Sequence, residues 1–347
     1  MWGVRKIPWH LDQEPDAEGG RLWPGLRPPS PDDGELAVGH DRVVREEHRR
    51  LHLGETITSQ AYDGLVSSRI RVGVARLPSR ESPEAAIELL LERGYAACEI
   101  DFESGFWMDY PFAERLGELA REHDVALSVH APLFGFMGHL EASGRKFASA
   151  VGALDRSAGI AAASGAELVV FHPGFLLGRS REDALAAVVE QLSALRERLE
   201  GKGRAVPFGV EVMGRVRDLG SLDDVVEISR RTRWVRPVLD FAHMHATSDG
   251  AFLGVEPFAE ALAAANEMLS PGAPVHIHFS DIAFAKRNET KHVPYGEGTL
   301  RAEPLRDALA GVERPATVIS ESPDERSSQA IRAVLDGSGD RATSRAS

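Results

Sequence analysis

The sequence predicts an α/β protein built as a single (β/α)8 TIM barrel with a poorly ordered N-terminal extension. From Arg69 onward, short β-branched runs alternate with amphipathic segments, the pattern of βα units around a parallel sheet. Eight such pairs follow one another in a chain of 347 residues, and one such barrel fills about 250 residues. An open doubly wound sheet would need a glycine-rich phosphate loop after its first strand, and the segment ARLPSRES there has none.

The strands are predicted from short runs of apolar, often β-branched residues. In chain order they are 69–75, 97–102, 126–132, 167–174, 207–212, 236–243, 275–281 and 317–322. The helices are predicted from apolar periodicity and end signals, such as Ser82–Pro83 at one start and Ser221 before an acidic first turn at another. The most clearly marked helices are 83–94, 145–165, 180–201, 221–232, 257–269, 303–312 and 325–337.

Composition changes sharply at both ends of this repeating region. Residues 1–65 contain PGLRPPSPDDG and the charged run DRVVREEHRR, without a clean strand or helix period, and we expect an extension that is largely loop or disordered. They could equally precede a true start near Val66. The barrel is assigned to 66–337, and 338–347 are expected to form a disordered tail.

Composition also excludes several classes of protein. One cysteine, Cys98, rules out a disulfide framework and a Cys-based zinc cluster, and its strand position predicts a small buried residue. No run approaches the roughly 20 apolar residues of a membrane span, so no membrane partner is expected. The N-terminus lacks the apolar core of a secretory signal, and a reducing cytoplasm is therefore expected. A net charge of −13 counts against a general nucleic-acid binder.

Residues that bind metals stand at the carboxyl ends of the predicted strands. Catalysis in a barrel takes place on that rim, because the eight βα loops converge there. One strand-end histidine is more often structural than a ligand, but imidazoles and carboxylates gathered on one rim predict a metal centre. The predicted set is His130, His172, Glu211, Asp240, His243, His278, Asp281, His292 and Glu321.

Glu211 holds a central position in this set. Its two carboxylate oxygens could bridge two metals about 3.5–4 Å apart, the arrangement used for phosphodiester hydrolysis. Asp240 and His243 are spaced to send one side chain to the barrel centre and the other to a neighbouring site.

The phrases SVHAPL, VFHPG, GVEV, LDFAH, HFSD, KHVPYGEG and ISES, in this order on these strands, resemble the endonuclease IV family of the xylose-isomerase-like superfamily. The resemblance spans about 69–336. It implies two or three zinc ions and cleavage of DNA at abasic sites, a DNA-repair activity, by a metal-activated hydroxide that Glu211 or Glu321 orients or deprotonates. The ligands it implies are His130, His172 and Glu211 for the first ion; Glu211, Asp240, His278 and Glu321 for the second; His243 and His292 for the third.

Two segments depart from the family pattern. The family has Asp-Arg-His before its last ligand, where this chain has Thr290-Lys291-His292, so the third ion lacks a carboxylate that Asp281 or a water would have to replace. The loop 102–112 is acidic and aromatic. Its Phe106 and Trp107 could stack on a base, could form a hydrophobic lid, or could pack on the N-terminal extension.

The same residues admit an alternative interpretation as a sugar isomerase or epimerase of this superfamily, which would act on a small sugar-like substrate. Such an enzyme holds one Mn²⁺ or Mg²⁺ with a Glu, Asp, His, Glu set, and Glu211 and Glu321 would move a proton beside a carbonyl. The discriminating residues are His130 and His172, because a one-metal enzyme needs no two imidazoles there.

The remaining polar residues are interpreted more simply. Alternation places His276 on the same side of its strand as His278, one layer deeper, as core or as support for a ligand. His139 and His245 lie near the rim. Basic residues at 286, 287 and 291, and at 179 and 181, are expected to form solvated loops, with phosphate contact as the functional alternative.

Overall fold

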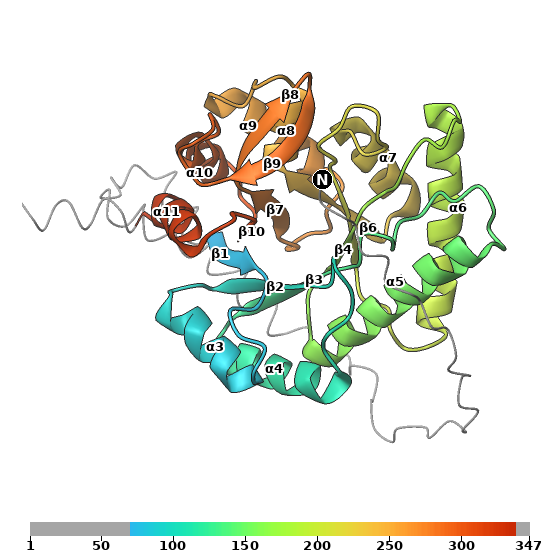
Figure 1. Cartoon of the computed structure of the whole chain (residues 1–347), viewed down its shortest axis with the longest axis horizontal. Helices are drawn as coiled ribbons and strands as arrows, with labels where there is room; N and C mark the ends of the chain where they lie inside the picture. Colours follow the sequence, from blue (N-terminus) through green and yellow to red (C-terminus); the bar gives the residue numbers. More distant parts are fainter. Residues whose placement is uncertain (1–69, 338–347) are drawn as a thin grey trace, which may run out of the picture. The chain divides into compact units, whose positions relative to one another are not determined.

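The computed structural model describes residues 70–337 and confirms the predicted fold class. Eight parallel strands close into a barrel in the order β1-β10-β7-β6-β5-β4-β3-β2, surrounded by helices (Figure 1). The predicted extension 1–65 and the predicted tail 338–347 lie outside the described residues.

The barrel strands are shorter than the apolar runs that predicted them. They are β1 Ile70–Ala75, β2 Ala97–Asp101, β3 Ala126–His130, β4 Val169–Phe171, β5 Phe208–Glu211, β6 Val235–Asp240, β7 Val275–Phe279 and β10 Ala316–Ser320. Pairing stops where the chain turns outward into the βα loops. His172 and Glu321 therefore follow their strands directly, while His130, Glu211 and Asp240 end theirs.

Helices cover the outside of the barrel, and side chains close their N-termini. Ser82 caps the first helix, Asp109 the second, and Ser221 forms a reciprocal capping box with Asp224. The helices are α3 Pro83–Glu92, α4 Tyr110–Glu122, α5 Arg145–Ser164, α6 Arg181–Glu200, α7 Leu222–Thr232, α8 Phe241–Thr247, α9 Val255–Asn266, α10 Ala302–Ala310 and α11 Glu325–Leu335. Within residues 70–337, no helix is long and apolar enough to cross a membrane.

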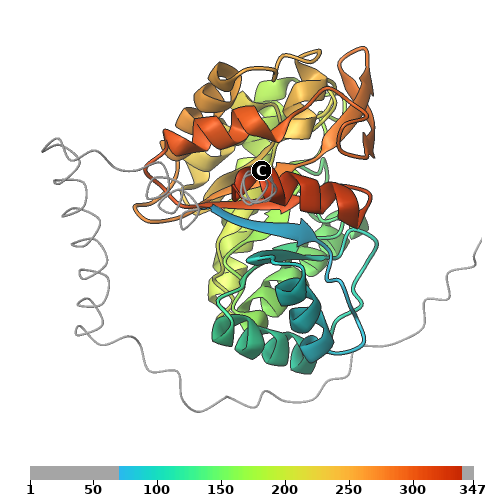
Figure 2. The same cartoon turned by 90° about the vertical axis from the view of Figure 1, so that its left-hand side faces the viewer.

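The predicted solvated loop 286–291 is instead part of an antiparallel hairpin, β8 Asp281–Ala285 with β9 Asn288–Val293. The two residues between the strands, Lys286 and Arg287, have φ of 53° and 60°. Positive φ at both positions is the turn that joins twisted hairpin strands. The hairpin projects from the end of the barrel to which the arrow of β1 points (Figure 2). Sequence periodicity missed it because β9 is rich in charged residues.

The predicted strand 236–243 is also wrong at its end. β6 stops at Asp240, and the short helix α8 begins at Phe241. Asp240 caps this helix, because its Oδ1 accepts a hydrogen bond of 2.8 Å from the backbone N–H of His243. His243 therefore reaches the rim from a helix, which turns it sideways from the barrel centre.

The apolar core lies mainly between strands and helices, where Phe171, Phe208, Phe241 and Phe258 are buried. Cys98 is buried there too, as predicted. Polar side chains, by contrast, are buried inside the barrel beneath its carboxyl rim, among them Glu99, Ser128 and His276. The rim and the layer beneath it therefore contain the candidate functional residues.

Candidate metal centre

The eight residues predicted as metal ligands fall into three adjoining groups at the carboxyl rim. Within each group, one possible ligand atom per residue lies within 4.8 Å of all the others. The groups are His130, His172 and Glu211; Glu211, Asp240, His278 and Glu321; and His243, His292 and the unpredicted Glu289.

The first group is two imidazoles around one carboxylate oxygen. The Nε2 atoms of His130 and His172 lie 3.2 and 3.0 Å from Oε2 of Glu211. His130 Nδ1 donates a hydrogen bond of 2.9 Å to the carbonyl of Ala131. That bond directs the lone pair of Nε2 into the group, as a metal ligand requires.

The second group uses the other oxygen of Glu211. His278 Nδ1 lies 3.3 Å from Glu211 Oε1 and 3.3 Å from Glu321 Oε1. Asp240 Oδ2 is fully buried and makes no hydrogen bond with any residue in 70–337. A cation would compensate this carboxylate oxygen, so the donor set fits a metal ion.

The third group contains a carboxylate that the sequence reasoning placed wrongly. His243 Nε2 lies 2.8 Å from Oε2 of Glu289, and both stand beside His292. Thr290, the residue in the expected position, is exposed and donates its hydroxyl hydrogen to the carbonyl of Ala283. The third group therefore has its anionic member, contrary to the prediction.

A β-bulge explains this exchange. Glu289 pairs with Phe284 and Lys291 with Ala283, so Thr290 is an extra residue in β9. An extra residue reverses the alternation of side chains beyond it. Glu289 consequently faces the same side as His292, three residues on, instead of the opposite side.

Gly214 makes room for this group. A Cβ at Gly214 would come within 2.4 Å of Glu289 Oε2 and 2.7 Å of His243 Cδ2. Its carbonyl also accepts a hydrogen bond of 2.8 Å from the Glu289 backbone N–H. The loop after β5 thereby holds the hairpin against the rim.

Asp281, the proposed substitute ligand, instead forms hydrogen bonds with the loop after the hairpin. Its carboxylate is buried and accepts backbone hydrogen bonds from Gly296, Gly298 and Leu300 at 2.8–3.2 Å. Arg301 also pairs with it at 3.2 Å. Asp281 holds the loop after the hairpin, and its prediction as a ligand is wrong.

Two carboxylates of the rim, Glu211 and Asp240, have pKa values shifted in opposite directions. Burial alone would raise the pKa of Glu211, but the charges of His278 and His172 and the hydrogen bond with His130 hold it well below its usual range. Burial raises the pKa of Asp240 well above its ordinary value; the charge of His243 opposes this shift, and the neighbouring Glu321 and Glu211 add to it. A divalent cation in the second group would favour the ionised form of Asp240.

A cavity of about 500 Å³ opens beside these groups. His130, His292 and Glu321 line it on the metal side, and Arg76 and Glu103 line its wall. The acidic residues of the cavity wall are Asp101, Glu103, Asp324 and Glu325.

The aromatic residues of the loop after β2 pack inward. Trp107 donates from Nε1 to the carbonyl of Asp101 at 2.9 Å, and Phe106 packs against buried Phe102 with ring centroids 4.8 Å apart. Arg80 and Arg156 cover their outer faces. In this arrangement the ring faces are already occupied, which disfavours stacking on a base.

Several other polar residues near the rim are held in structural contacts. Arg179 donates to the carbonyl of Gly138, and Arg181 pairs with Asp224. His139 hydrogen bonds to the carbonyl of Phe136 at 3.1 Å. The remaining rim histidine, at 245, contacts the hydroxyl of Thr299 at 2.8 Å.

Sequence reasoning missed two residues, Glu289 and Glu99. The only sequence signal for Glu289 was that it lies three residues before His292. In a regular strand such residues face opposite sides, so the two side chains meet only because of the bulge. The signal for Glu99 was a carboxylate in the middle of the predicted strand 97–102, because buried parallel strands are mostly apolar.

A closed barrel with three groups of imidazoles and carboxylates on its rim defines a TIM barrel with candidate metal-binding groups. Residues 87–338 match the xylose isomerase-like TIM barrel family, and the chain belongs to that family.

Three known proteins are similar to this chain. An uncharacterized protein of Methanocaldococcus jannaschii is 28% identical over 254 residues, covering 72% of this chain and 91% of that protein. Endonuclease IV from Thermus thermophilus superposes with a TM-score of 0.59 at 20% identity, covering 77% of this chain and 98% of its own. A D-tagatose 3-epimerase-like protein superposes with a TM-score of 0.61 at 21% identity, covering 80% and 100%. At these identities the two superpositions show a shared fold.

Proposed function

We propose that this protein is a metal-dependent phosphodiester hydrolase that holds two or three zinc ions and acts on DNA at abasic sites. The observation that carries the proposal is the position of Glu211. One of its oxygens faces His130 and His172, and the other faces His278. A carboxylate with both oxygens committed to imidazoles on opposite sides is suited to bridge two ions.

The chemistry follows from this arrangement. Bound zinc ions lower the pKa of water and stabilise negative charge on phosphoryl oxygens. Glu321 faces the cavity with 15% of its side chain exposed, so it can orient an attacking water and accept its proton. Glu211, Asp240 and His278 are buried, and they would hold the reacting groups in fixed positions.

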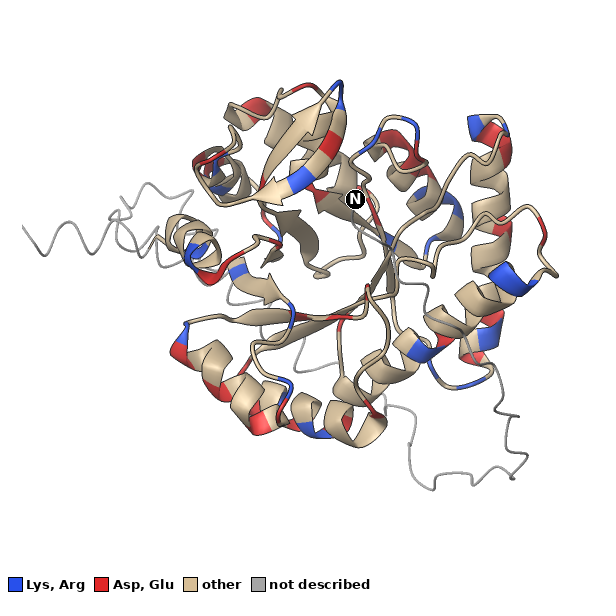
Figure 3. Cartoon of the chain, in the orientation of Figure 1, with Lys and Arg blue, Asp and Glu red and all other residues tan. Residues whose placement is uncertain are grey.

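Exposed basic residues on the β8–β9 hairpin are available for phosphate contacts. Lys286 and Arg287 form the exposed tip of the β8–β9 hairpin, and Lys291 is exposed on β9 (Figure 3). Asp109, one of the acids in the loop after β2, caps α4 with its carboxylate and is thereby partly compensated. These positions support a nucleic-acid substrate despite the net charge of −13.

One observation favours a second function, epimerisation or isomerisation of a small sugar with one Mn²⁺ or Mg²⁺. The cavity of about 500 Å³ suits a monosaccharide, and acids outnumber arginines among its lining residues, which favours a neutral substrate. Glu211 and Glu321 would then transfer the proton, both lying 3.3 Å from the same nitrogen of His278.

The metal content of the full-length protein, purified without chelator, separates the two functions. The hydrolase requires two or three zinc ions per chain, nicking of an abasic-site oligonucleotide, and loss of both on His130→Ala. His139→Ala is the matched control, because that histidine contacts the backbone of Phe136 and belongs to none of the groups.

The epimerase predicts the opposite pattern. One Mn²⁺ or Mg²⁺ per chain, unchanged in His130→Ala, together with epimerisation of a ketose, would overturn the hydrolase.

The hydrolase should also bind DNA less tightly as salt increases. For each tenfold rise in salt concentration, the logarithm of the binding constant should fall by about 0.9 per phosphate contact, and cleavage at low DNA concentration should fall with it.

A further inference from the structure

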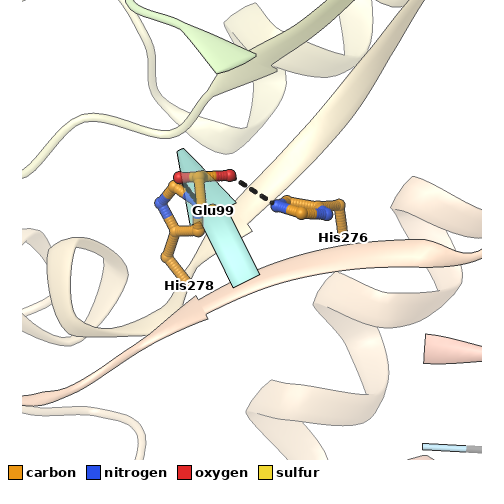
Figure 4. Close-up of side chains that lie close together, drawn as sticks. All are labelled: Glu99, His276 and His278. Carbon is orange, nitrogen blue, oxygen red and sulfur yellow. Dashed lines mark hydrogen bonds and ion pairs between the residues drawn. The ribbon is translucent and has the colours of Figure 1, made fainter. Parts of the chain in front are cut away.

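A second buried polar cluster lies beneath the metal groups, inside the barrel. Glu99 of β2 lies between His276 and His278 of β7 (Figure 4), and Ser128 of β3 lies next to it. All four side chains are buried. A carboxylate at this depth is costly unless its position serves a purpose.

One oxygen of Glu99 is fully engaged. Its Oε2 accepts a hydrogen bond of 2.7 Å from the Ser128 hydroxyl and one of 3.0 Å from His276 Nε2. The barrel register explains the first contact, because Glu99 and Ser128 are paired neighbours on β2 and β3. These two donors hold the carboxylate in a fixed orientation.

The other oxygen faces a residue of the metal centre. Glu99 Oε1 lies 3.0 Å from His278 Nε2. Neither atom has a well-aligned hydrogen bond to any residue in 70–337. Their contact with each other is therefore what compensates two buried polar atoms.

This contact favours one tautomer of His278. With hydrogen on Nε2, the ring presents a positive edge to a buried carboxylate oxygen 3.0 Å away, whereas an unprotonated Nε2 would leave two electron-rich atoms in contact. The contact therefore favours hydrogen on Nε2. In the neutral ring the lone pair then lies on Nδ1, which faces Glu211 and Glu321 at 3.3 Å.

We propose that Glu99 is a positioning residue that presents Nδ1 of His278 to the ion of the second group, with Ser128 and His276 holding Glu99 in turn. The proposal rests on the metal centre proposed above, and on neither of the two reactions. Carboxylates that accept the second N–H of a ligating histidine contribute about ten- to a hundredfold in metal affinity.

An ion bound by Glu99, His276 and His278 themselves is the competing explanation, because their ligand atoms also lie close together. The single lone pair of a neutral imidazole argues against it. An ion there would take the lone pair of His278 at Nε2, and the same ring could then not present Nδ1 to the second group.

The test is zinc binding to full-length Glu99→Gln, measured by competition with a chromophoric chelator and by metal content. We expect the weakest-held zinc of the wild type to bind about ten- to a hundredfold less tightly. Nitrogen-15 NMR of the imidazoles should show His278 losing its single tautomer. Asp155→Asn, which removes a buried carboxylate outside the barrel, should bind zinc as the wild type does.

The outcomes separate this inference from the proposed function. If the wild type binds no zinc, the metal centre itself fails. If the wild type binds zinc and Glu99→Gln binds it equally tightly with the same tautomer, the positioning role is overturned. Loss of one whole ion, with the affinity of the others unchanged, would instead place an ion at Glu99.

Ser128→Ala keeps the test decisive if Glu99→Gln does not fold. It removes one hydrogen bond to Glu99 and leaves every candidate ligand of the three groups in place. We expect a rise of about two- to tenfold in the zinc dissociation constant, as the loss of about one hydrogen bond implies. Unchanged affinity in this folded variant would also overturn the proposal.

Discussion

Two buried carboxylates in this molecule have opposite surroundings. Asp155 of α5 lies outside the barrel with 6% of its side chain exposed, and Arg198, Lys202 and Arg204 pair with it. Glu211 lies on the rim with 1% of its side chain exposed, and its partners there are histidines. Both are stabilised by several cationic or potentially cationic groups.

The identity of those groups separates a structural carboxylate from a functional one. Guanidinium and ammonium groups have no lone pair to offer at neutral pH, so the Asp155 cluster can only be an ion-pair network. An imidazole can exchange its proton for a metal ion. The histidines around Glu211 are therefore candidate ligands, whereas the cations around Asp155 are not.

Glu211→Gln should have the largest effect on the metal centre. The substitution removes the one group shared by two sets of ligands, so we expect loss of at least one ion. Activity should fall at least about a thousandfold, corresponding to several kcal/mol of lost charge stabilisation. Metal analysis and initial rates test this. Retention of both metal and activity would show that Glu211, like Asp155, is a structural carboxylate.

The pH dependence of metal affinity comes next. Burial alone would lower the pKa of His130, but its hydrogen bond with Glu211 and the charge of Glu211 raise it to about 10 in the metal-free protein. Zinc must displace that proton, so affinity should fall about tenfold for each unit of decreasing pH below 10, per proton displaced. Chelator competition between about pH 6 and 8 measures this, and a flat profile would contradict it.

The pKa shifts of His130 and Asp155 have opposite effects on how folding stability depends on pH. Because the pKa of His130 is raised, its contribution in the metal-free protein is present below its ordinary value, about 6.5, and is lost as pH rises toward 10. Burial alone would raise the pKa of Asp155, but hydrogen bonds from Lys202, Arg204 and Arg198 lower it. The Asp155 contribution is present above its ordinary value, about 3.9, and is lost as pH falls below that.

Glu289→Gln should affect only the third group. If the bulge makes Glu289 the anionic member, this variant should hold one fewer ion or bind it about ten- to a hundredfold less tightly. Thr290→Ala is the matched control at the adjacent position and should retain the wild-type metal content. Loss of metal in Thr290→Ala instead would restore the expected motif and contradict the geometry.

Asp155→Asn should have the smallest effect on the metal centre, namely none. We expect the free energy of unfolding to fall by about 1–3 kcal/mol, because charge-assisted hydrogen bonds are lost while the three cations keep access to water. Chemical denaturation measures the loss. A change in metal content would show that the two carboxylates are not independent.

The barrel could be predicted from the sequence because its signals are local. Each strand is a short apolar run, and several helices begin with a side-chain cap, as at Ser82 and Ser221. The positions of His130, Glu211 and Asp240 at strand ends were equally readable, since parallel strands bring their carboxyl ends to one rim. Sequence order alone therefore placed most of the site.

Other features depended on contacts between distant residues. The bulge that turns Glu289 toward His243 requires the pairing of β8 with β9, and the space it occupies requires Gly214 from another loop. The burial of Asp281 as a loop anchor likewise depends on a segment 15 to 20 residues later. No periodicity within one segment encodes such contacts.

The sequence by itself determined the fold class and the eight residues that could bind metal. Only the tertiary structure decided that Glu289 completes the third group and that Glu99 lies beneath His278. The physical reason is that apolar periodicity and capping act within a few residues. Which oxygen faces which nitrogen is set by register and packing across the closed barrel.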